Sequence, residues 1–298
     1  MQTDNQFTLA VASGKGGTGK TLVASNLAML AARKGATVAL VDCDVEAPND
    51  HLFFSAASTE RTVVDTVVAS VDATVCAACG ACSAACAYGA VRVLGTSALV
   101  FDELCHGCGL CPTVCLSGAI REVARRVGEV EVSTVAGHPG LTLITGRLDV
   151  GQTKSPLVIR AAREASARSA AQLIVLDAPP GVACSAVAAV RDADALLLVT
   201  EPTRFGLHDL ELSLHLGLDM GIPMGVLVNR DTEAPDRVES LSSHLGAVVV
   251  GRIPFDRAIA EAYARGALVA EEIPAVGDIL ADIVERMRRM AASGVRSR

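Results

Sequence analysis

A glycine-rich segment near the start of the chain has the residue types and spacing of a phosphate-binding loop. The run satisfies the pattern G-x-x-x-x-G-K-T and reads Gly14-Lys15-Gly16-Gly17-Thr18-Gly19-Lys20-Thr21. Glycines let backbone N–H groups converge on phosphate oxygens, and the N-terminus of a following helix adds positive charge. We therefore expect Lys20 to reach the β and γ phosphates and Thr21 to ligate Mg²⁺. A glycine-rich turn without a ligand is the alternative.

Eight of the ten cysteines form two copies of one metal-binding pattern. The pattern is C-x2-C-x2-C-x3-C, first with Cys76, Cys79, Cys82 and Cys86, then with Cys105, Cys108, Cys111 and Cys115. Three closely spaced thiolates can cap one face of a [4Fe-4S] cluster, and the fourth ligand then comes from farther along the chain. The spacing predicts two [4Fe-4S] clusters. Zinc sites, which use paired C-x2-C units, and disulfides are the alternatives.

The cysteine-rich stretch resembles the two-cluster ferredoxins. In that family the fourth cysteine of each run binds the other cluster, which implies an exchange of Cys86 and Cys115. The implied ligand sets are Cys76, Cys79, Cys82 and Cys115 for one cluster and Cys86, Cys105, Cys108 and Cys111 for the second. Ala87 and Leu116 replace the proline that usually follows the fourth cysteine, which affects solvent access or stability but removes no ligand. His106 is interpreted as a loop residue that tunes the second cluster.

The glycine-rich loop also resembles the deviant Walker A sequence of the MinD/ParA and nitrogenase iron-protein superfamily. The resemblance rests on Lys15, an additional lysine inside the loop. In that superfamily this lysine reaches across a dimer interface to the partner's nucleotide, so the resemblance implies an ATP-sandwiched homodimer. It also implies catalytic roles for Lys15 and Lys20 in hydrolysis of ATP to ADP and phosphate, slow and stimulated by a partner. A solvated surface lysine is the alternative for Lys15.

Three carboxylates stand where the superfamily has its switch residues. Asp42 and Asp44 follow the second predicted strand, and Asp177 ends a later one in the run Asp-Ala-Pro-Pro-Gly. The resemblance implies that Asp44 orients the attacking water, that Asp42 supports Mg²⁺, and that Asp177 holds Mg²⁺ through water. It places the Gly181 N–H near the γ phosphate. Capping of strand and helix ends is the alternative role for the three carboxylates.

Two further segments resemble the superfamily's adenine-recognition elements. They contribute Asn229 and Arg230 in one run and Pro254 in the other. Altogether the resemblance to the superfamily covers residues 7–52 and 151–265.

Two cysteines lie outside the repeated pattern. Cys43 stands between the two switch aspartates, and Cys184 follows Asp177 by seven residues. The nitrogenase iron protein has a cluster ligand at a comparable distance, so a shared third cluster is one interpretation of Cys184. A small buried thiol is the other.

These residues require a scaffold in which strands and helices alternate. Short apolar strands are predicted at 7–12, 37–41, 173–176, 195–200, 225–229 and 247–250, with helices at 21–34, from Ser155 towards Ala171, at 207–218 and at 235–245. Alternation of this kind favours a mostly parallel sheet with helices on both faces. We therefore expect a P-loop ATPase domain formed by residues 1–60 and 151–298. Residues 61–150 are predicted to be an inserted, small α+β, ferredoxin-like domain with its cluster motifs at 76–115.

Composition limits the compartments and binding partners that can be expected for this protein. The start, Met1 to Gln6, lacks the features of a signal peptide, and no apolar run is long enough to span a membrane, so a cytoplasmic protein is expected. The net charge of -7 and the absence of Trp argue against nucleic-acid binding. Apolar residues recur at helical spacing near the C-terminus, at Ile279, Leu280, Ile283, Met287 and Met290, before a basic tail with Arg296 and Arg298. Packing on the ATPase core is expected, with membrane contact as the alternative.

Three functions fit these features. The first is an ATP-hydrolysing protein with ATP, Mg²⁺ and two [4Fe-4S] clusters, in which nucleotide-driven rearrangement of a homodimer gates electron transfer to a partner protein. The second is an ATPase that assembles or delivers iron-sulfur clusters to an apo-protein. The third is a MinD/ParA-like positioning ATPase whose clusters sense redox state. Two clusters at ferredoxin spacing form an electron path, which favours the first.

Overall fold

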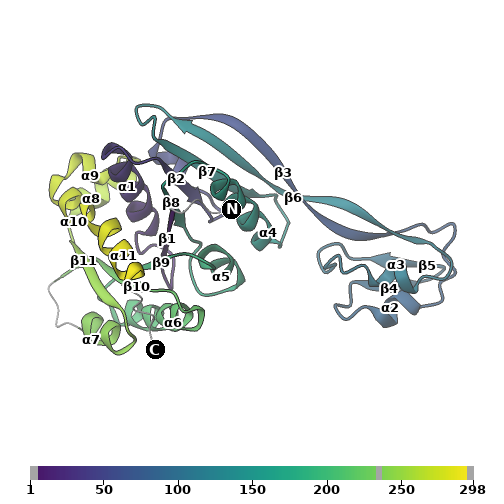
Figure 1. Cartoon of the computed structure of the whole chain (residues 1–298). Coiled ribbons are helices and arrows are strands. Elements are labelled where there is room, and N and C mark those ends of the chain that lie inside the picture. Colours follow the sequence, from purple (N-terminus) through teal and green to yellow (C-terminus); the bar gives the residue numbers. More distant parts are fainter. Residues whose placement is uncertain (1–5, 233–236, 294–298) are drawn as a thin grey trace.

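The chain is built around one large sheet. The computed structural model describes residues 6–232 and 237–293. In this part of the chain nine strands form a sheet in the order β11-β10-β9-β1-β8-β2-β7-β6-β3 (Figure 1). Neighbouring strands from β11 to β7 are parallel, whereas β6 and β3 join antiparallel. The predicted α/β class with a mostly parallel sheet is confirmed.

The parallel strands are short, and all of them except the edge strand β11 are mostly buried. They are β1 (Phe7–Ala12), β2 (Val38–Asp42), β7 (Leu141–Leu148), β8 (Leu173–Asp177), β9 (Ala195–Thr200), β10 (Met224–Asp231) and β11 (Val248–Pro254). Sequence analysis predicted all of them except β7. That strand lies within residues 61–150, which were assigned to the insert, yet it pairs with β2 and belongs to the main sheet. The assignment was wrong there because only pairing with β2 distinguishes this strand from a hairpin strand.

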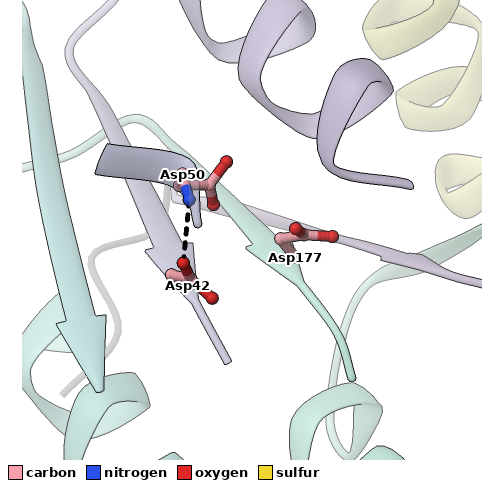
Figure 2. Close-up of side chains that lie close together, drawn as sticks. All are labelled: Asp42, Asp50 and Asp177. Atoms are coloured by element: carbon pink, nitrogen blue, oxygen red, sulfur yellow. Dashed lines mark hydrogen bonds between the residues drawn. The ribbon is translucent and has the colours of Figure 1, made fainter. Parts of the chain in front are cut away.

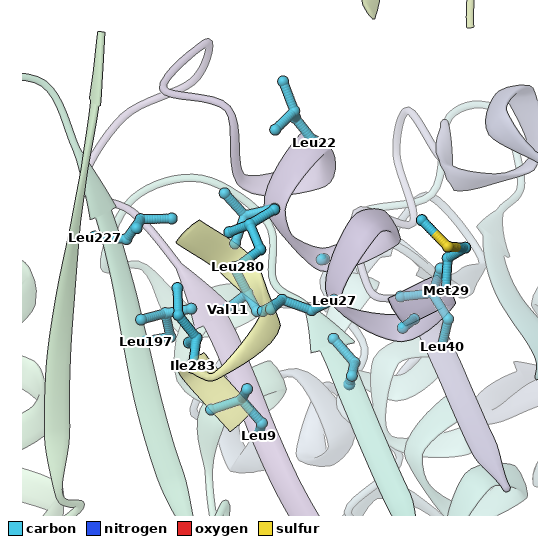
Figure 3. Close-up of a cluster of buried hydrophobic side chains, with 14 of the residues drawn as sticks. Leu9, Val11, Leu22, Leu27, Met29, Leu40, Leu197, Leu227, Leu280 and Ile283 are labelled. Carbon is cyan, nitrogen blue, oxygen red and sulfur yellow. The ribbon is translucent and has the colours of Figure 1, made fainter. Parts of the chain in front are cut away.

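Helices cover both faces of the sheet. One face carries α1 (Lys20–Arg33), α8 (Arg257–Ala264), α9 (Val269–Glu272), α10 (Pro274–Ala281) and α11 (Ile283–Ala292). The other carries α4 (Ser155–Ala167), α5 (Cys184–Val190), α6 (Arg204–Met220) and α7 (Arg237–His244). Alternate residues of β1 face the two helical layers, because side chains along a strand point to opposite faces. Leu9 belongs to the layer with α1 and lies near Ile283 of α11 (Figure 3), whereas Ala10 belongs to the layer with α4 to α7.

The apolar residues near the C-terminus belong to this core. Leu280, Ile283 and Met287 are buried in the layer with α1, and Ile279 and Met290 pack against it. The expected packing on the ATPase core is therefore confirmed. The basic tail with Arg296 and Arg298, residues Met1 to Asn5 and the first residues of the helix predicted at 235–245 lie outside the described residues. Within the described ranges, no helix has the length and apolar character needed to cross a membrane.

A long two-stranded ribbon projects from the edge of the sheet. It consists of β3 (Ala56–Val71), which follows the short 3-10 helix η1 (Asp50–Phe53), and of β6 (Ile120–Val135). At its far end lies a small lobe with α2 (Ala81–Ala85), β4 (Val91–Leu94), β5 (Ser97–Val100) and α3 (Leu110–Val114) (Figure 1). We call residues 72–119 the cysteine lobe. An apolar cluster separate from the main core joins the lobe to the end of the ribbon, and it includes Val91 and Ala98 of the lobe with Val68 and Ile120 of the ribbon.

Candidate functional site

A cavity of about 490 Å³ opens at the carboxyl ends of the parallel strands, where ligands bind in open α/β sheets. Nine predicted nucleotide-site residues line it: Gly16, Gly17, Gly19, Lys20, Thr21, Asp44, Asn229, Arg230 and Pro254. Of the remaining predicted ATP-site residues, Gly14, Lys15, Thr18 and Gly181 are not among its lining residues. The fold thus joins segments more than 200 positions apart in the sequence into one concave site.

Two glycines of the loop are required by close packing. A side chain at Gly14 would overlap the backbone carbonyl of Asp209, so only glycine lets α6 approach the loop. Gly19 has φ of 98°, and a side chain there would overlap the Asn229 amide group. That amide donates to the Thr18 carbonyl oxygen at 2.7 Å. Contacts with β10 and α6 therefore fix the conformation of the loop.

Lys15 is paired within its own chain. Its Nζ lies 3.4 Å from Glu201 Oε2, and its side chain is 33% exposed. Arg230 Nη1 donates to Glu201 Oε1 at 2.5 Å, so one carboxylate joins the loop to the predicted adenine segment. Sequence analysis missed Glu201, although it follows β9 directly, in the strand-end position that identified Asp42 and Asp177. For Lys15 to reach a partner's nucleotide, this ion pair must open.

Two buried carboxylates lie side by side beneath the loop. Asp42 and Asp177 are register partners on the adjacent strands β2 and β8. Thr21 Oγ1 donates to Asp177 Oδ2 at 2.6 Å. Burial, followed by the charge of Asp177, raises the pKa of Asp42 to about 7, and burial raises the pKa of Asp177 to about 6. The pair therefore favours a compensating proton or cation.

Asp42 also organises the chain that follows it. Its carboxylate accepts backbone N–H groups from Asp44 at 3.1 Å, Asn49 at 2.7 Å and Asp50 at 3.0 Å. The first aspartate of the predicted switch thus shapes the loop that carries the second. Burial also raises the pKa of Asp44, while the nearby charge of Lys20 lowers it. The Gly181 N–H, expected near the γ phosphate, donates to the Ser13 carbonyl oxygen at 2.9 Å.

Asp50 is a third carboxylate at this position, and sequence analysis missed it. It is fully buried at the start of η1, and the three aspartates converge from β2, η1 and β8 (Figure 2). One carboxylate oxygen from each lies within 4.8 Å of the others. Asp50 carries no sequence signal, because it follows a polar loop and continues neither a strand nor a recognised motif.

The eight patterned cysteines surround two separate cavities in the cysteine lobe. One cavity is lined by Cys76, Cys79, Cys82 and Cys115, and the other by Cys86, Cys105, Cys108 and Cys111. Each cavity therefore has three cysteines from one run and the fourth from the other run. This is the same division that the resemblance to ferredoxins implied.

Several of these sulfur atoms receive hydrogen bonds from the backbone. The Ala69 N–H approaches Cys105 Sγ at 3.5 Å, and the Ala90 N–H approaches Cys86 Sγ at 3.3 Å. Backbone N–H groups lower the pKa of the Cys76 thiol, and the Ser117 side chain lowers that of Cys115. Such donors stabilise thiolates, the form in which cysteine binds metal.

The remaining predicted thiols and His106 have distinct surroundings. Cys43 is fully buried in the core beside α4, where burial raises the pKa of its thiol, as expected for a structural cysteine. Cys184 is exposed at the start of α5. The His106 ring stacks on Tyr88 with centroids 3.8 Å apart, and both rings border the cavity that contains Cys105.

Comparison with known proteins agrees with this architecture. The model of the CobQ/CobB/MinD/ParA nucleotide-binding domain matches residues 9–269. The chain belongs to this family. An uncharacterized protein of Methanocaldococcus jannaschii is 34% identical over 206 residues, which are 67% of this chain and 70% of that protein. Like the other members of the CobQ/CobB/MinD/ParA family, the chain therefore has a nucleotide-binding domain.

Two further similarities are informative. The septum site-determining protein MinD of Pyrococcus horikoshii, solved with Mg-ADP, matches with a TM-score of 0.59 and 17% identity over 97% of this chain and 98% of that one, which shows the shared fold. An iron-sulfur cluster carrier protein of Pseudomonas fragi is 47% identical over 53 residues, 18% of each chain. The second similarity is short and covers less than a fifth of either chain.

Proposed function

We propose that this protein is an ATP-hydrolysing iron-sulfur protein in which nucleotide-driven rearrangement of a homodimer controls electron transfer to a partner protein. The observation that carries the proposal is the division of eight cysteines into two sets of four around separate cavities. Four thiolates are the usual ligand set of a [4Fe-4S] cluster. Bound clusters would supply one-electron transfer, and the nucleotide site would supply the control.

The cysteine lobe offers each cluster a route to solvent. Cys79 and Cys108, the second cysteine of each run, are exposed, whereas the third cysteines, Cys82 and Cys111, are buried. Each set of ligands is thus anchored on the apolar cluster of the lobe and open on one side. A redox partner could approach through the open side, as needed for electron exchange between proteins.

The nucleotide site has groups for the steps of ATP hydrolysis. Lys20 and the loop N–H groups would hold the phosphates, Thr21 would ligate Mg²⁺, and Asp44 at the cavity wall would orient water for attack on the γ phosphorus. The bond between the γ phosphorus and the bridging oxygen breaks, and ADP and phosphate leave. In the proposed dimer, Lys15 exchanges its ion pair with Glu201 for the partner's nucleotide.

Covalent and polar links connect the nucleotide site to the lobe. Asn49 and Asp50 donate to Asp42, and η1 then leads directly into β3, one of the two strands that carry the lobe. A second link is Lys154, just before α4, whose Nζ donates to the Cys105 carbonyl oxygen at 2.6 Å. Movement of the switch loop on binding or loss of the γ phosphate would therefore reach the lobe from two sides.

The test combines cluster analysis with redox titration. Protein purified without oxygen should contain close to eight iron and eight acid-labile sulfide, because eight thiolates complete two cubanes. Both clusters are then titrated, with electron paramagnetic resonance (EPR) detection, without nucleotide, with Mg-ADP and with a non-hydrolysable ATP analogue. The midpoint potentials should differ between states, and nucleotide affinity should change reciprocally on reduction. The Lys20→Ala variant should keep both clusters and lose the nucleotide effect.

Two outcomes would contradict the proposal. Stoichiometric zinc without sulfide would show that the cysteines do not bind iron-sulfur clusters. Equal midpoint potentials and electron-transfer rates in all three nucleotide states would show that nucleotide does not control the clusters. The second outcome favours cluster assembly or delivery, a function supported by the similarity to the Pseudomonas fragi carrier protein. Transfer of iron and sulfide to an apo-protein, measured by reconstitution of that protein, distinguishes delivery from electron transfer.

A further inference from the structure

Asp50 presents a buried carboxylate with no partner at the nucleotide site. The residue is fully buried, and among the described residues neither side-chain oxygen has a hydrogen-bond partner. Its backbone N–H is fixed by Asp42 Oδ2. An isolated buried carboxylate is strongly unfavourable unless a cation or a proton compensates it. The side chain therefore requires a partner that the polypeptide around it does not supply.

The two neighbouring carboxylates, Asp42 and Asp177, also have acceptor positions that no hydrogen bond among the described residues uses. Asp177 Oδ1 is buried and has no partner among the described residues, while Oδ2 accepts the Thr21 hydroxyl. Asp42 Oδ1 accepts only the Asp44 N–H, although a carboxylate oxygen can accept two hydrogen bonds. Each aspartate can thus offer an oxygen, and one carboxylate oxygen of each residue lies within 4.8 Å of one from the other two residues (Figure 2).

We propose that Asp42, Asp50 and Asp177 bind a hard divalent cation, Mg²⁺ or Mn²⁺, in the absence of nucleotide. Oxygen ligands and a high negative charge suit such ions, which complete their coordination with water. The Thr21 hydroxyl donates to Asp177, and Lys20 acts electrostatically on the same carboxylate. Both residues also line the nucleotide cavity, so the cation is placed next to where the phosphates will arrive. In this arrangement the protein holds metal before ATP binds, and Asp50 is the residue that adds this property to the nucleotide site.

The inference depends on the nucleotide-binding domain and not on the iron-sulfur clusters. A protein that lacks clusters, or whose cluster potentials do not depend on bound nucleotide, would still bind the cation. A protein with working clusters could equally fail to bind it. The two proposals can therefore be refuted separately.

The test is a titration with Mn²⁺ of the full-length protein, purified without oxygen and freed of nucleotide and of Mg²⁺. The six-line EPR signal of free Mn²⁺ reports binding. Wild type should bind one Mn²⁺ per chain, and Mg²⁺ should displace it. Asp50→Asn should weaken binding at least tenfold, whereas Asp65→Asn, an exposed control on β3, should bind like wild type. Mg²⁺ alone should raise the unfolding temperature of wild type and of Asp65→Asn, but not of Asp50→Asn.

Three results would overturn the inference. The first is absence of Mn²⁺ binding by wild type without nucleotide, which needs no variant to interpret. The second is equal Mn²⁺ affinity in Asp50→Asn and wild type. The third is an unfolding temperature of the full-length wild-type protein that Mg²⁺ does not change, which would show that protons and not cations compensate the three carboxylates.

Discussion

The buried carboxylates make stability depend on pH in an unusual direction. Because Asp42 has a pKa of about 7 in the folded protein, against 3.8 ordinarily, the folded state binds its proton more tightly than the unfolded state. The stabilisation from this proton is complete below pH 4 and is lost as pH rises towards 7. Each pH unit is worth about 1.4 kcal/mol. Between pH 5 and pH 8 the metal-free protein should therefore lose about 3 kcal/mol of its free energy of unfolding through this group.

The assay is urea unfolding of the nucleotide-free protein in chelator at several pH values, followed by circular dichroism. The informative quantity is the difference between wild type and Asp42→Asn, because titration of unrelated groups cancels in it. The carboxylates of Asp177 on β8 and Asp50 on η1 lie close to Asp42, and Lys20 on α1 acts electrostatically on Asp177; all three residues are retained in the variant. The stability advantage of wild type over Asp42→Asn should shrink by about 3 kcal/mol from pH 5 to pH 8.

A difference that stays constant over this range would refute the reasoning, because it would mean that Asp42 is ionised throughout. A difference that grows with pH would show that the folded state favours the charged carboxylate. In that case the three backbone N–H groups that Asp42 accepts would outweigh its burial and the charge of Asp177.

Four further predictions concern the loop and the cysteine lobe. Lys20→Ala should abolish Mg-ATP binding in calorimetry, because the phosphates lose their main cationic contact. Lys15→Ala should still bind Mg-ATP but should hydrolyse it more slowly and show weaker ATP-dependent dimerisation in ultracentrifugation. An ATP turnover rate equal to that of wild type would contradict the contact of Lys15 with the partner's nucleotide. Gly107→Ala should lower the iron content, because its side chain would overlap a carbonyl of β3, whereas Gly118→Ala, at a similar positive φ with open space, should retain iron. Lys154→Met should remove a hydrogen bond worth about 1.5 to 3 kcal/mol. Amide hydrogen exchange near the second cysteine run should then become faster. Unchanged exchange would show that Lys154 does not link the cysteine lobe to the ATPase domain.

The sequence alone was sufficient for the elements whose signals are local. The phosphate-binding loop is identified by eight consecutive residues, and the cysteine runs by their spacing. Buried parallel strands such as β1 and β9 are short apolar runs, so their positions were predicted from composition and periodicity. The positions of Asp42 and Asp177 at strand ends also follow from local signals, whereas their side-by-side placement depends on the pairing of β2 with β8.

Tertiary structure decided everything that depends on pairing between distant segments. The sequence pattern of β7 fits a hairpin strand, and only its position between β2 and β6 assigns it to the main sheet. Glu201 and Asp50 became site residues through contacts with segments far from them in sequence: the loop that carries Lys15, and β8 with Asp177. Lys154 meets Cys105 only because the ribbon of β3 and β6 brings the lobe back to α4. Burial and charge, which set the chemistry of these groups, are properties of packed surroundings, and one-dimensional spacing does not specify them.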